Sequence, residues 1–458
     1  MSPLWTSAEI EQATDGQASA AFEVSGVTFD SREVEPGHLF VAMPGTVADG
    51  HQFVERAFAS GASAVLVSQP VDGPHVLVPD VAAALTALAI AARARATEAT
   101  ILGVTGSVGK TSTKEALAAA LERRCRGRVH RSVKSYNNHT GVPLSLARMP
   151  RETRFGVFEM GMNHSGEIQQ LTALVRPHVA LITAIAPAHI ENLGSIEAIA
   201  DAKGEIFEGL EPGGTAILPN DSPQRDQLLS AARRYATNIV TFGSGDADVA
   251  AKHAVRADSG GSLVTARLHD CELTFTIAQA GEHWVSNALA VLAAVEAVGA
   301  DLAAAGLALA DLGGLKGRGE RRRVALAAGG EALLIDESYN ANPASMVATL
   351  ANLAAERCTG RRIAVLGTMR ELGEHSDAEH AALAQPVLAA KVDQLILVGR
   401  ETRPLQSALA GALSVTMVAD ADTAADVLLA TMQVGDAVLV KASNGVGLAR
   451  LVDRVAGA

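Results

Sequence analysis

Residues 101–113 restrict the possible folds of this chain more than any other segment. They read ILGVTGSVGKTST, an apolar run typical of a buried strand that leads into a glycine-containing loop. A helix is expected to follow over residues 114–122. Gly106 and Gly109 let the loop backbone turn its N–H groups toward a phosphate, and a helix N-terminus favours an anion. This strand–loop–helix unit predicts a binding site for a nucleoside triphosphate.

The Lys-Thr pair in this segment supports the same prediction. Lys110 can place a positive charge beside the β- and γ-phosphates, and the Thr111 hydroxyl can ligate Mg²⁺. The general P-loop pattern has glycine where this chain has Val104, and the alternative is a glycine-rich turn with an exposed lysine. We expect phosphate contacts from Thr105, Gly106, Ser107, Val108, Gly109, Lys110, Thr111 and Ser112. Because switches, kinases, motors and ligases share such loops, the loop does not identify the reaction.

Apolar runs alternate with helical patterns over most of the chain, which is typical of α/β folds with mostly parallel sheets. Three regions differ in the length and alternation of their predicted strands and helices. Short strands with glycine turns extend to about residue 80, longer strands and helices alternate to about residue 315, and a second alternating series follows. Residues 263–277 instead alternate like an antiparallel hairpin. The last region predicts a small, doubly wound, Rossmann-like domain.

The composition excludes several classes of protein. The net charge is −12 and no block of Lys and Arg suggests a track for a phosphate backbone, which argues against nucleic-acid binding. Hydrophobic residues make up 48%, enough to fill several cores. The N-terminus lacks a signal-peptide core, and the apolar stretch 81–96 contains two arginines and is too short to span a bilayer. We therefore expect a cytoplasmic protein without membrane insertion.

Polar residues after the central strands indicate a metal site. Glu159 ends the strand expected at 155–159, and strand ends at one edge of a parallel sheet face the same crevice as the P-loop. A carboxylate there can ligate Mg²⁺, and His189, after the strand expected at 179–185, could ligate a second cation. Lys203 lies early in a helical segment, and its position alone indicates an exposed helix lysine.

Taken together, these motifs resemble the Mur ligase family over nearly the whole chain. The matching segments are 30–32 (DSR), 37–45 (GHLFVAMPG), 49–51 (DGH), 105–111 (TGSVGKT), 137–143 (NNHTGVP), 159–162 (EMGM), 188–191 (AHIE), 203–206 (KGEI), 336–343 (DESYNANP) and 369–376 (MRELGEHS). The combination is far more specific than any single motif.

The resemblance implies an α/β fold of three domains. These are a UDP-substrate-binding domain over residues 1–82, a central ATP-binding P-loop domain over 83–315 and a C-terminal Rossmann-like lid over 316–458. It implies a monomeric, ATP- and Mg²⁺-dependent ligase that activates a carboxylate as an acyl phosphate and couples it to an amine. The member resembled most joins D-alanyl-D-alanine to UDP-N-acetylmuramoyl-tripeptide in peptidoglycan synthesis.

The resemblance also implies roles for single residues. Thr111 and Glu159 would hold one Mg²⁺, while His189 and a carbamylated Lys203 would hold a second, which reverses the interpretation of Lys203 as an exposed residue. The groups acting directly on the reaction would be Lys110, Lys203, His189 and Arg318. The further ATP contacts would be Asn287, Arg318, Asp336, Tyr339, Asn340 and Asn342. Substrate contacts would come from Ser31, Arg32, Asp49 and His51 for the UDP group, from Asn137, Asn138 and Thr140 for the muramoyl peptide, and from Lys441 and Ser443 near the amine.

Two features depart from the family pattern. Relatives usually read Lys-Gly-Ser-Arg near the C-terminus, whereas this chain reads KASN over 441–444, so the usual arginine is absent. The basic stretch 318–323 has no assigned role beyond Arg318. Candidate acceptors for the proton of the attacking amine are His375 and His380, although histidines at a polar helix start are commonly only solvated.

Two alternative functions stay open. A sibling ligase that adds the third amino acid shares the DSR segment, but its lid carries an Asp-Asn-Pro-Arg motif, and residues 338–344 of this chain read SYNANPA. A P-loop switch or binding module is the alternative from a different class. It would use hydrolysis only to time an interaction and would need neither a UDP site nor Lys203.

Overall fold

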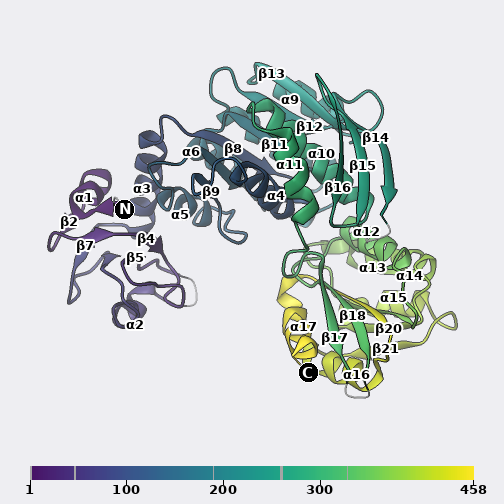
Figure 1. Ribbon diagram of the computed structural model, residues 1–458. Coiled ribbons are helices and arrows are strands. Elements are labelled where there is room, and N and C mark those ends of the chain that lie inside the picture. Colours follow the sequence, from purple (N-terminus) through teal and green to yellow (C-terminus); the bar gives the residue numbers. More distant parts are fainter. Residues whose placement is uncertain (1–2, 46–47, 189, 258–260, 327–328, 458) are drawn as a thin grey trace.

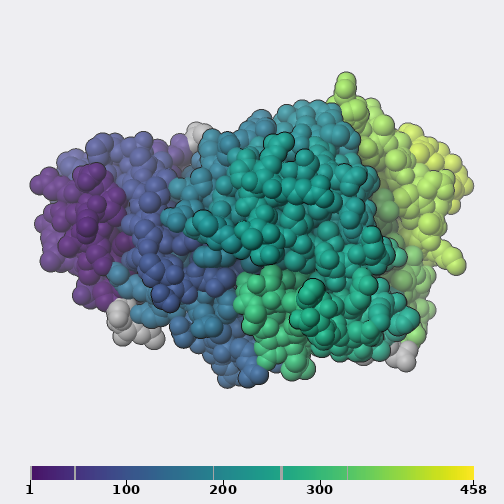
Figure 2. All heavy atoms as spheres, turned by 90° about the horizontal axis from the view of Figure 1, so that it is seen from above, coloured from purple at the N-terminus to yellow at the C-terminus, as the bar shows by residue number. Residues whose placement is uncertain are grey.

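The computed structural model describes residues 3–45, 48–188, 190–257, 261–326 and 329–457. Figure 1 shows a central α/β unit with a smaller α/β unit at either end. In the space-filling view from above, the purple N-terminal part and the yellow C-terminal part lie at opposite ends of the molecule (Figure 2). Within the described residues, no helix is both long enough and apolar enough to cross a membrane.

The N-terminal sheet has five short strands in the order β2-β7-β6-β5-β4. All neighbours pair in parallel except β2 with β7. Its elements are α1 (Ser7–Thr14), β2 (Gln17–Ala18), β4 (Gly26–Thr28), β5 (His38–Val41), α2 (Val54–Ala59), β6 (Ala64–Val67) and β7 (His75–Leu77). A two-stranded ribbon, β1 (Trp5–Thr6) with β3 (Glu23–Val24), lies beside them. The short strands expected before residue 80 are therefore confirmed.

The central sheet has nine strands in the order β16-β15-β14-β13-β12-β11-β8-β10-β9. Strands from β9 to β14 pair in parallel, whereas β14, β15 and β16 pair antiparallel, which confirms the expected hairpin. The strands are β8 (Thr100–Thr105), β9 (Val129–Arg131), β10 (Phe155–Glu159), β11 (Val179–Ile182), β12 (Thr215–Pro219), β13 (Asn238–Gly243), β14 (Val249–Arg256), β15 (Ser262–Arg267) and β16 (Glu272–Ile277).

Helices cover both faces of the central sheet, which explains why its parallel strands read as continuous apolar runs. One face packs against α4 (Lys110–Glu122), α10 (Glu282–Ala297) and α11 (Leu302–Asp311). The other packs against α5 (Gly141–Ala147), α6 (Glu167–Val175), α8 (Ile196–Gly204) and α9 (Arg225–Ala232). The short helix α7 (Ile190–Leu193) precedes α8.

Two expected boundaries in this region were wrong. Helix α4 begins at Lys110 rather than at residue 114, because Gly109 takes the left-handed conformation (φ 83°) just before the first helical turn. Strand β11 ends at Ile182 rather than at residue 185, because the following residues leave the sheet and bind the P-loop. The Ser107 amide donates to the Ala184 carbonyl at 2.8 Å.

The C-terminal sheet has six strands in the order β17-β18-β22-β19-β20-β21. Its strands are β17 (Glu320–Ala325), β18 (Glu331–Glu337), β19 (Arg362–Gly367), β20 (Gln394–Val398), β21 (Val415–Val418) and β22 (Ala437–Lys441). Its helices of six or more residues are α12 (Pro343–Ala354), α13 (Ser376–Ala382), α14 (Ala384–Ala389), α15 (Arg403–Ala408), α16 (Ala421–Thr431) and α17 (Leu448–Ala456). Strands β18 to β21 pair in parallel, as a Rossmann-like domain requires.

Strand β17, which the sequence did not reveal, accounts for the basic stretch. It pairs antiparallel with β18 at the edge of the sheet. Its arginines form ion pairs: Arg321 with the buried Glu356, Arg322 with Glu320 and Arg323 with Glu331. Charged side chains on an edge strand discourage pairing with another chain.

Helix α3 (Val81–Arg95) joins the N-terminal and central units. It runs unbroken across the boundary expected between residues 82 and 83. Its buried side chains share a core with Leu144 and Ala147 of α5 and with the N-terminal strands. The Trp5 indole donates to the Ala147 carbonyl at 2.8 Å across the same junction. The N-terminal unit is therefore anchored to the central one by apolar packing.

The core around α4 generates a stability prediction. Leu117 of α4 is 0% exposed between the sheet and α10. We expect Leu117→Ala to lower the free energy of unfolding by about 2–5 kcal/mol, because it leaves a cavity in packed surroundings. Chemical denaturation followed by circular dichroism measures this change. Leu307→Ala in α11 is the control, because Leu307 is 59% exposed; an equal shift of both midpoints would contradict the predicted packing.

Candidate active site

The carboxyl ends of β8, β10 and β11 lie side by side in the sheet and carry the residues that the sequence singled out. The P-loop follows β8, Glu159 ends β10, and residues 183–188 follow β11. The loop after β11 packs on the P-loop, because Ser107 Oγ donates to the Ala186 carbonyl at 2.9 Å and accepts from its amide at 3.0 Å. Thr183 Oγ1 lies 2.5 Å from the Val108 carbonyl oxygen, to which it donates.

The P-loop has the shape expected of a phosphate site. Gly106 has φ 147°, and any side chain there would collide with Thr183. Gly109 precedes the first turn of α4, so the N-terminus of that helix faces the crevice. Lys110 Nζ donates to the Gly106 carbonyl at 2.6 Å, and burial lowers the pKa of this lysine.

Glu159 lies at the centre of this edge. Its side chain is 1% exposed and accepts hydrogen bonds from Thr111 Oγ1 at 2.8 Å and from Asn137 Nδ2 at 2.7 Å. A hydroxyl beside a buried carboxylate suits Mg²⁺, which retains several waters and takes few protein ligands. The described residues contain no group of three or more His, Cys, Asp and Glu side chains that could enclose a metal. The donors present therefore fit a Mg²⁺ that a polyphosphate helps to hold.

Lys203 is buried rather than exposed, so the interpretation from its position alone was wrong. It is 1% exposed near the end of α8. Burial and the charge of Lys110 hold the pKa of Lys203 well below its ordinary value. No carboxylate of the described chain lies within ion-pair distance of it. The expected second cation ligand, His189, lies outside the described residues.

The sequence analysis missed two polar residues that contact the candidate site residues. Lys114 is completely buried one turn after Lys110, and its Nζ donates to the carbonyls of Ser132 at 2.7 Å and Lys134 at 2.5 Å. It also lies 3.8 Å from a carboxylate oxygen of Glu159. The spacing of four residues from Lys110 was the available signal, since it places both lysines on one helix face.

Ser135 is the second missed residue. Arg318 Nη2 donates to Ser135 Oγ at 3.2 Å, and Ser135 Oγ lies 3.2 Å from Thr111 Oγ1. Because the Thr111 hydroxyl donates to Glu159, the Ser135 hydroxyl is left to donate to Thr111. A polar chain therefore runs from the arginine of the C-terminal hinge to the buried carboxylate. Nothing in the sequence singled out Ser135 other than its position shortly before the NNHTG segment.

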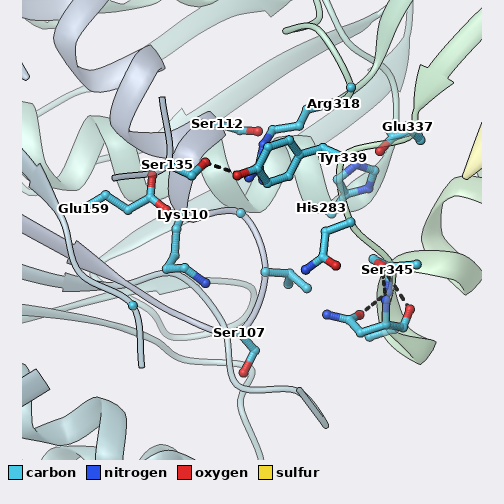
Figure 3. Close-up of a pocket in the computed structure, with 18 of the residues that line it drawn as sticks. Ser107, Lys110, Ser112, Ser135, Glu159, His283, Arg318, Glu337, Tyr339 and Ser345 are labelled. Atoms are coloured by element: carbon cyan, nitrogen blue, oxygen red, sulfur yellow. Dashed lines mark hydrogen bonds between the residues drawn. The ribbon is translucent and has the colours of Figure 1, made fainter. Parts of the chain in front are cut away.

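A cavity of about 470 Å³ lies between the central and C-terminal units, and Figure 3 shows side chains of both lining it. The central unit contributes the P-loop, Glu159 and Asn287, and the guanidinium of Arg318 stacks 4.1 Å from the ring centroid of Tyr339. Of the expected ATP and substrate residues, the wall contains Ser107, Val108, Gly109, Lys110, Ser112, Asn137, Asn138, Asn287, Arg318, Tyr339, Asn340, Asn342 and Lys441. Thr105, Gly106 and Thr111 are buried beneath the wall.

Asp336 does not line this cavity, contrary to the expectation that it contacts ATP. Its buried carboxylate accepts from the Gly317 amide at 2.8 Å and from the amide and hydroxyl of Ser338 at 3.0 and 2.6 Å. It therefore fixes the hinge before Arg318. Asn342 lines the cavity and also caps α12, because its side chain accepts from the Ser345 amide.

Lys441 and Ser443, both expected near the amine substrate, line different cavities. Lys441 lies on the wall of the 470 Å³ cavity, where its Nζ donates to the Asn340 carbonyl at 3.0 Å and pairs with Glu337 at 3.5 Å. Ser443 lines a second cavity of about 220 Å³, whose wall also includes Lys110. His380 is buried, with Nε2 accepting from the Met369 amide and Nδ1 donating to the Ser376 carbonyl, so neither nitrogen faces a substrate. His375 is exposed at the start of α13.

The expected UDP residues lie in the N-terminal unit, outside both cavities. Arg32 is bidentate to Asp30, at 2.9 and 2.7 Å, and this hydrogen bond lowers the pKa of Asp30 to about 2. His51 Nδ1 lies 2.6 Å from Asp49, while Nε2 accepts from the Ser68 amide. Ser31 is buried, and Thr140 donates to Asn138 at 3.1 Å rather than to the cavity.

Glu33 connects this unit to the P-loop edge. It pairs with Lys134 and accepts from the Tyr136 hydroxyl at 3.2 Å. Lys134 and Tyr136 lie in the loop after β9, and Lys114 of the P-loop helix donates to the Lys134 carbonyl in the same loop. This loop therefore contacts both the DSR segment and the helix that follows the P-loop.

Three family models match the chain. The Mur ligase family, catalytic domain model matches residues 23–125, the Mur ligase middle domain model residues 104–295, and the Mur ligase, glutamate ligase domain model residues 317–444. Together they cover all three units of the structure.

Individual relatives agree with the family models. The UDP-N-acetylmuramoyl-tripeptide–D-alanyl-D-alanine ligase of Escherichia coli is 36% identical, over 88% of each chain. A crystal structure of MurF from Acinetobacter baumannii matches with a TM-score of 0.84 and 29% identity over both whole chains. The structure of MurF from Thermotoga maritima in complex with ADP matches with a TM-score of 0.76 and 27% identity, over 94% of this chain and 97% of that one. With the P-loop, the buried Glu159 and Lys203 and the cavity between two α/β units all in place, this chain belongs to the Mur ligase family.

Proposed function

We propose that this protein is the ATP-dependent ligase that joins D-alanyl-D-alanine to UDP-N-acetylmuramoyl-tripeptide, giving the pentapeptide precursor of peptidoglycan, ADP and phosphate. Its relatives with this name cover most of the chain at more than 30% identity. The observation that carries the proposal is the cavity that joins the P-loop, the Asn137–Asn138 turn and the C-terminal residues Arg318 and Tyr339. The protein would act as a cytoplasmic monomer with domains over residues 1–82, 83–315 and 316–458.

ATP would lie in the 470 Å³ cavity. The P-loop amides and Lys110 would hold its phosphates, Asn287 would meet the adenine, and Arg318 would reach the γ-phosphate from the hinge. The match to a relative that binds ADP supports this placement. Lys441 and Glu337 would contribute to the nucleotide side of the cavity rather than to the amine side.

Mg²⁺ would bind at Thr111 and Glu159, where it would neutralise phosphate charge. A second cation would use His189 and carbamylated Lys203. Carbamylation requires a neutral amine, and burial without a counter-ion favours the neutral form of Lys203. A carbamate would replace a buried ammonium with an anionic oxygen ligand.

The chemistry joins two anions, so the site must reduce their repulsion. The terminal carboxylate of the tripeptide attacks the γ-phosphorus, and the bond to the bridging oxygen breaks to release ADP. Lys110 and Arg318 stabilise the charge that spreads over the γ-phosphate oxygens. The neutral amine of the dipeptide then attacks the acyl carbon, loses a proton, and expels phosphate as the C–O bond breaks.

The C-terminal unit would protect the acyl phosphate from water. Tyr339, Asn340 and Asn342 lie on the cavity wall opposite the P-loop. Exclusion of water by such a domain prevents hydrolysis and strengthens the electrostatic interactions inside the site.

The proposed reaction makes a direct prediction. We expect phosphate release from ATP to require both UDP-N-acetylmuramoyl-tripeptide and D-alanyl-D-alanine, and mass spectrometry to detect the UDP-muramoyl pentapeptide. Turnover with a free amino acid and a shorter UDP-muramoyl peptide would instead identify the sibling ligase. Phosphate release stimulated by a protein partner alone would identify a switch.

The proposed role of Lys203 makes a second prediction. We expect Lys203→Ala to reduce kcat by at least about 100-fold, because charge stabilisation near the γ-phosphate is lost. A short carboxylic acid added to this variant should restore part of the rate by supplying the missing oxygen ligand. Lys391→Ala, which changes an exposed lysine of the C-terminal unit, is the control. Full activity of Lys203→Ala would contradict the assigned role.

A further inference from the structure

The second cavity, of about 220 Å³, adjoins the first one at the P-loop. Ser107, Lys110 and residues 340–342 line both cavities. If the γ-phosphate is bound at Lys110, the smaller cavity opens directly onto the position where the acyl phosphate forms. Its volume is below the range of about 300–1,000 Å³ that is typical of sites for drug-sized ligands. The smaller cavity therefore suits a short second reactant.

The wall opposite Lys110 comes from two turns of the C-terminal unit. The turn after β19 contributes Arg370 and Glu371, and the turn after β22 contributes Ser443, Asn444 and Gly445. Arg370 gives this wall a guanidinium, whose planar fork of donors matches a carboxylate.

The position of Arg370 is fixed from both ends. Its amide donates to Ser443 Oγ at 2.9 Å, and the same hydroxyl donates to the Ala341 carbonyl at 3.3 Å. Its guanidinium lies against Gly445, where Nη2 donates to the carbonyl at 3.2 Å. A Cβ on residue 445 would fall on the guanidinium, so the glycine makes room for it.

The guanidinium still has donors to offer. Within the described chain, the Gly445 carbonyl is its only hydrogen-bond partner, and no carboxylate pairs with it. A guanidinium carries five N–H donors in a planar fork that matches a carboxylate. The other turn presents the neutral Asn444 to this cavity, so the guanidinium on this wall comes from Arg370.

We infer that Arg370 binds the terminal carboxylate of the amine substrate and thereby selects a dipeptide with a free C-terminus. The inference rests on the proposed function. An extended dipeptide spans about 7 Å from amine to carboxylate. Because Lys110 lines the same cavity as Arg370, a carboxylate held at Arg370 leaves the amine inside the cavity that opens onto the acyl phosphate. Ser443 is a positioning residue that fixes the turn carrying Arg370.

The test compares Arg370→Met with the wild type, using D-alanyl-D-alanine and its C-terminal amide. We expect the variant to raise the KM for the dipeptide about 10- to 100-fold, because a charge-assisted hydrogen bond is lost. The KM values for ATP and for the UDP-linked substrate should not change. The wild type should prefer the free acid over the amide, and Arg370→Met should lose this preference, which a merely structural role would not alter.

Two further variants sharpen the test. Arg403→Met removes an exposed arginine of α15, outside both cavities, and should keep the wild-type preference. The double variant Arg370→Met with Asn444→Arg returns a guanidinium to the same cavity and should recover part of the preference for the free acid.

The outcomes separate the two proposals. A wild-type protein that does not use the dipeptide overturns the proposed function and this inference with it. A wild type that does use it, together with an unchanged KM and an unchanged preference in Arg370→Met, overturns only the role of Arg370.

Discussion

A carboxylate buried at the end of β10 organises the site. Burying a charge is costly unless it is paired and hydrogen-bonded, and Glu159 obtains its side-chain partners from two different segments. Thr111 and Lys114 come from α4, and Asn137 comes from the loop before α5. The P-loop helix, the central strand and this loop are therefore held in one arrangement. A divalent cation at the carboxylate would strengthen the same arrangement.

Polar contacts connect the two outer units to this centre, in addition to the apolar packing around α3. On one side, Glu33 binds Lys134 and Tyr136 in the loop that Lys114 supports. On the other side, Arg318 reaches Thr111 through Ser135. Both outer units therefore reach the edge of the sheet that carries the P-loop through hydrogen bonds and ion pairs.

The sequence predicted much of the fold, because parallel strands buried on both faces are continuous apolar runs. Strand β10 and the hairpin of β15 and β16 lie where the sequence predicted them. It missed β17, because three adjacent arginines interrupt the alternation of apolar and polar residues that indicates a strand. Their partners Glu356, Glu320 and Glu331 become apparent only in the folded structure. The helical position of Lys203 by itself wrongly indicated exposure, because a helix position does not reveal which face the surrounding units cover. The resemblance to the family had already reversed that interpretation.

The sequence by itself determined the phosphate loop, the three α/β regions and the family, since each depends on local spacing and on order along the chain. The tertiary structure alone decided which groups meet across the units. It placed Lys114 beside Glu159 and Ser135 beside Thr111, directed Asp336 toward the hinge and put Lys441 on the wall of the larger cavity. It also placed Arg370 over Gly445, 75 residues away in the chain. Such contacts depend on how the sheets pack, and residue spacing carries no record of that packing.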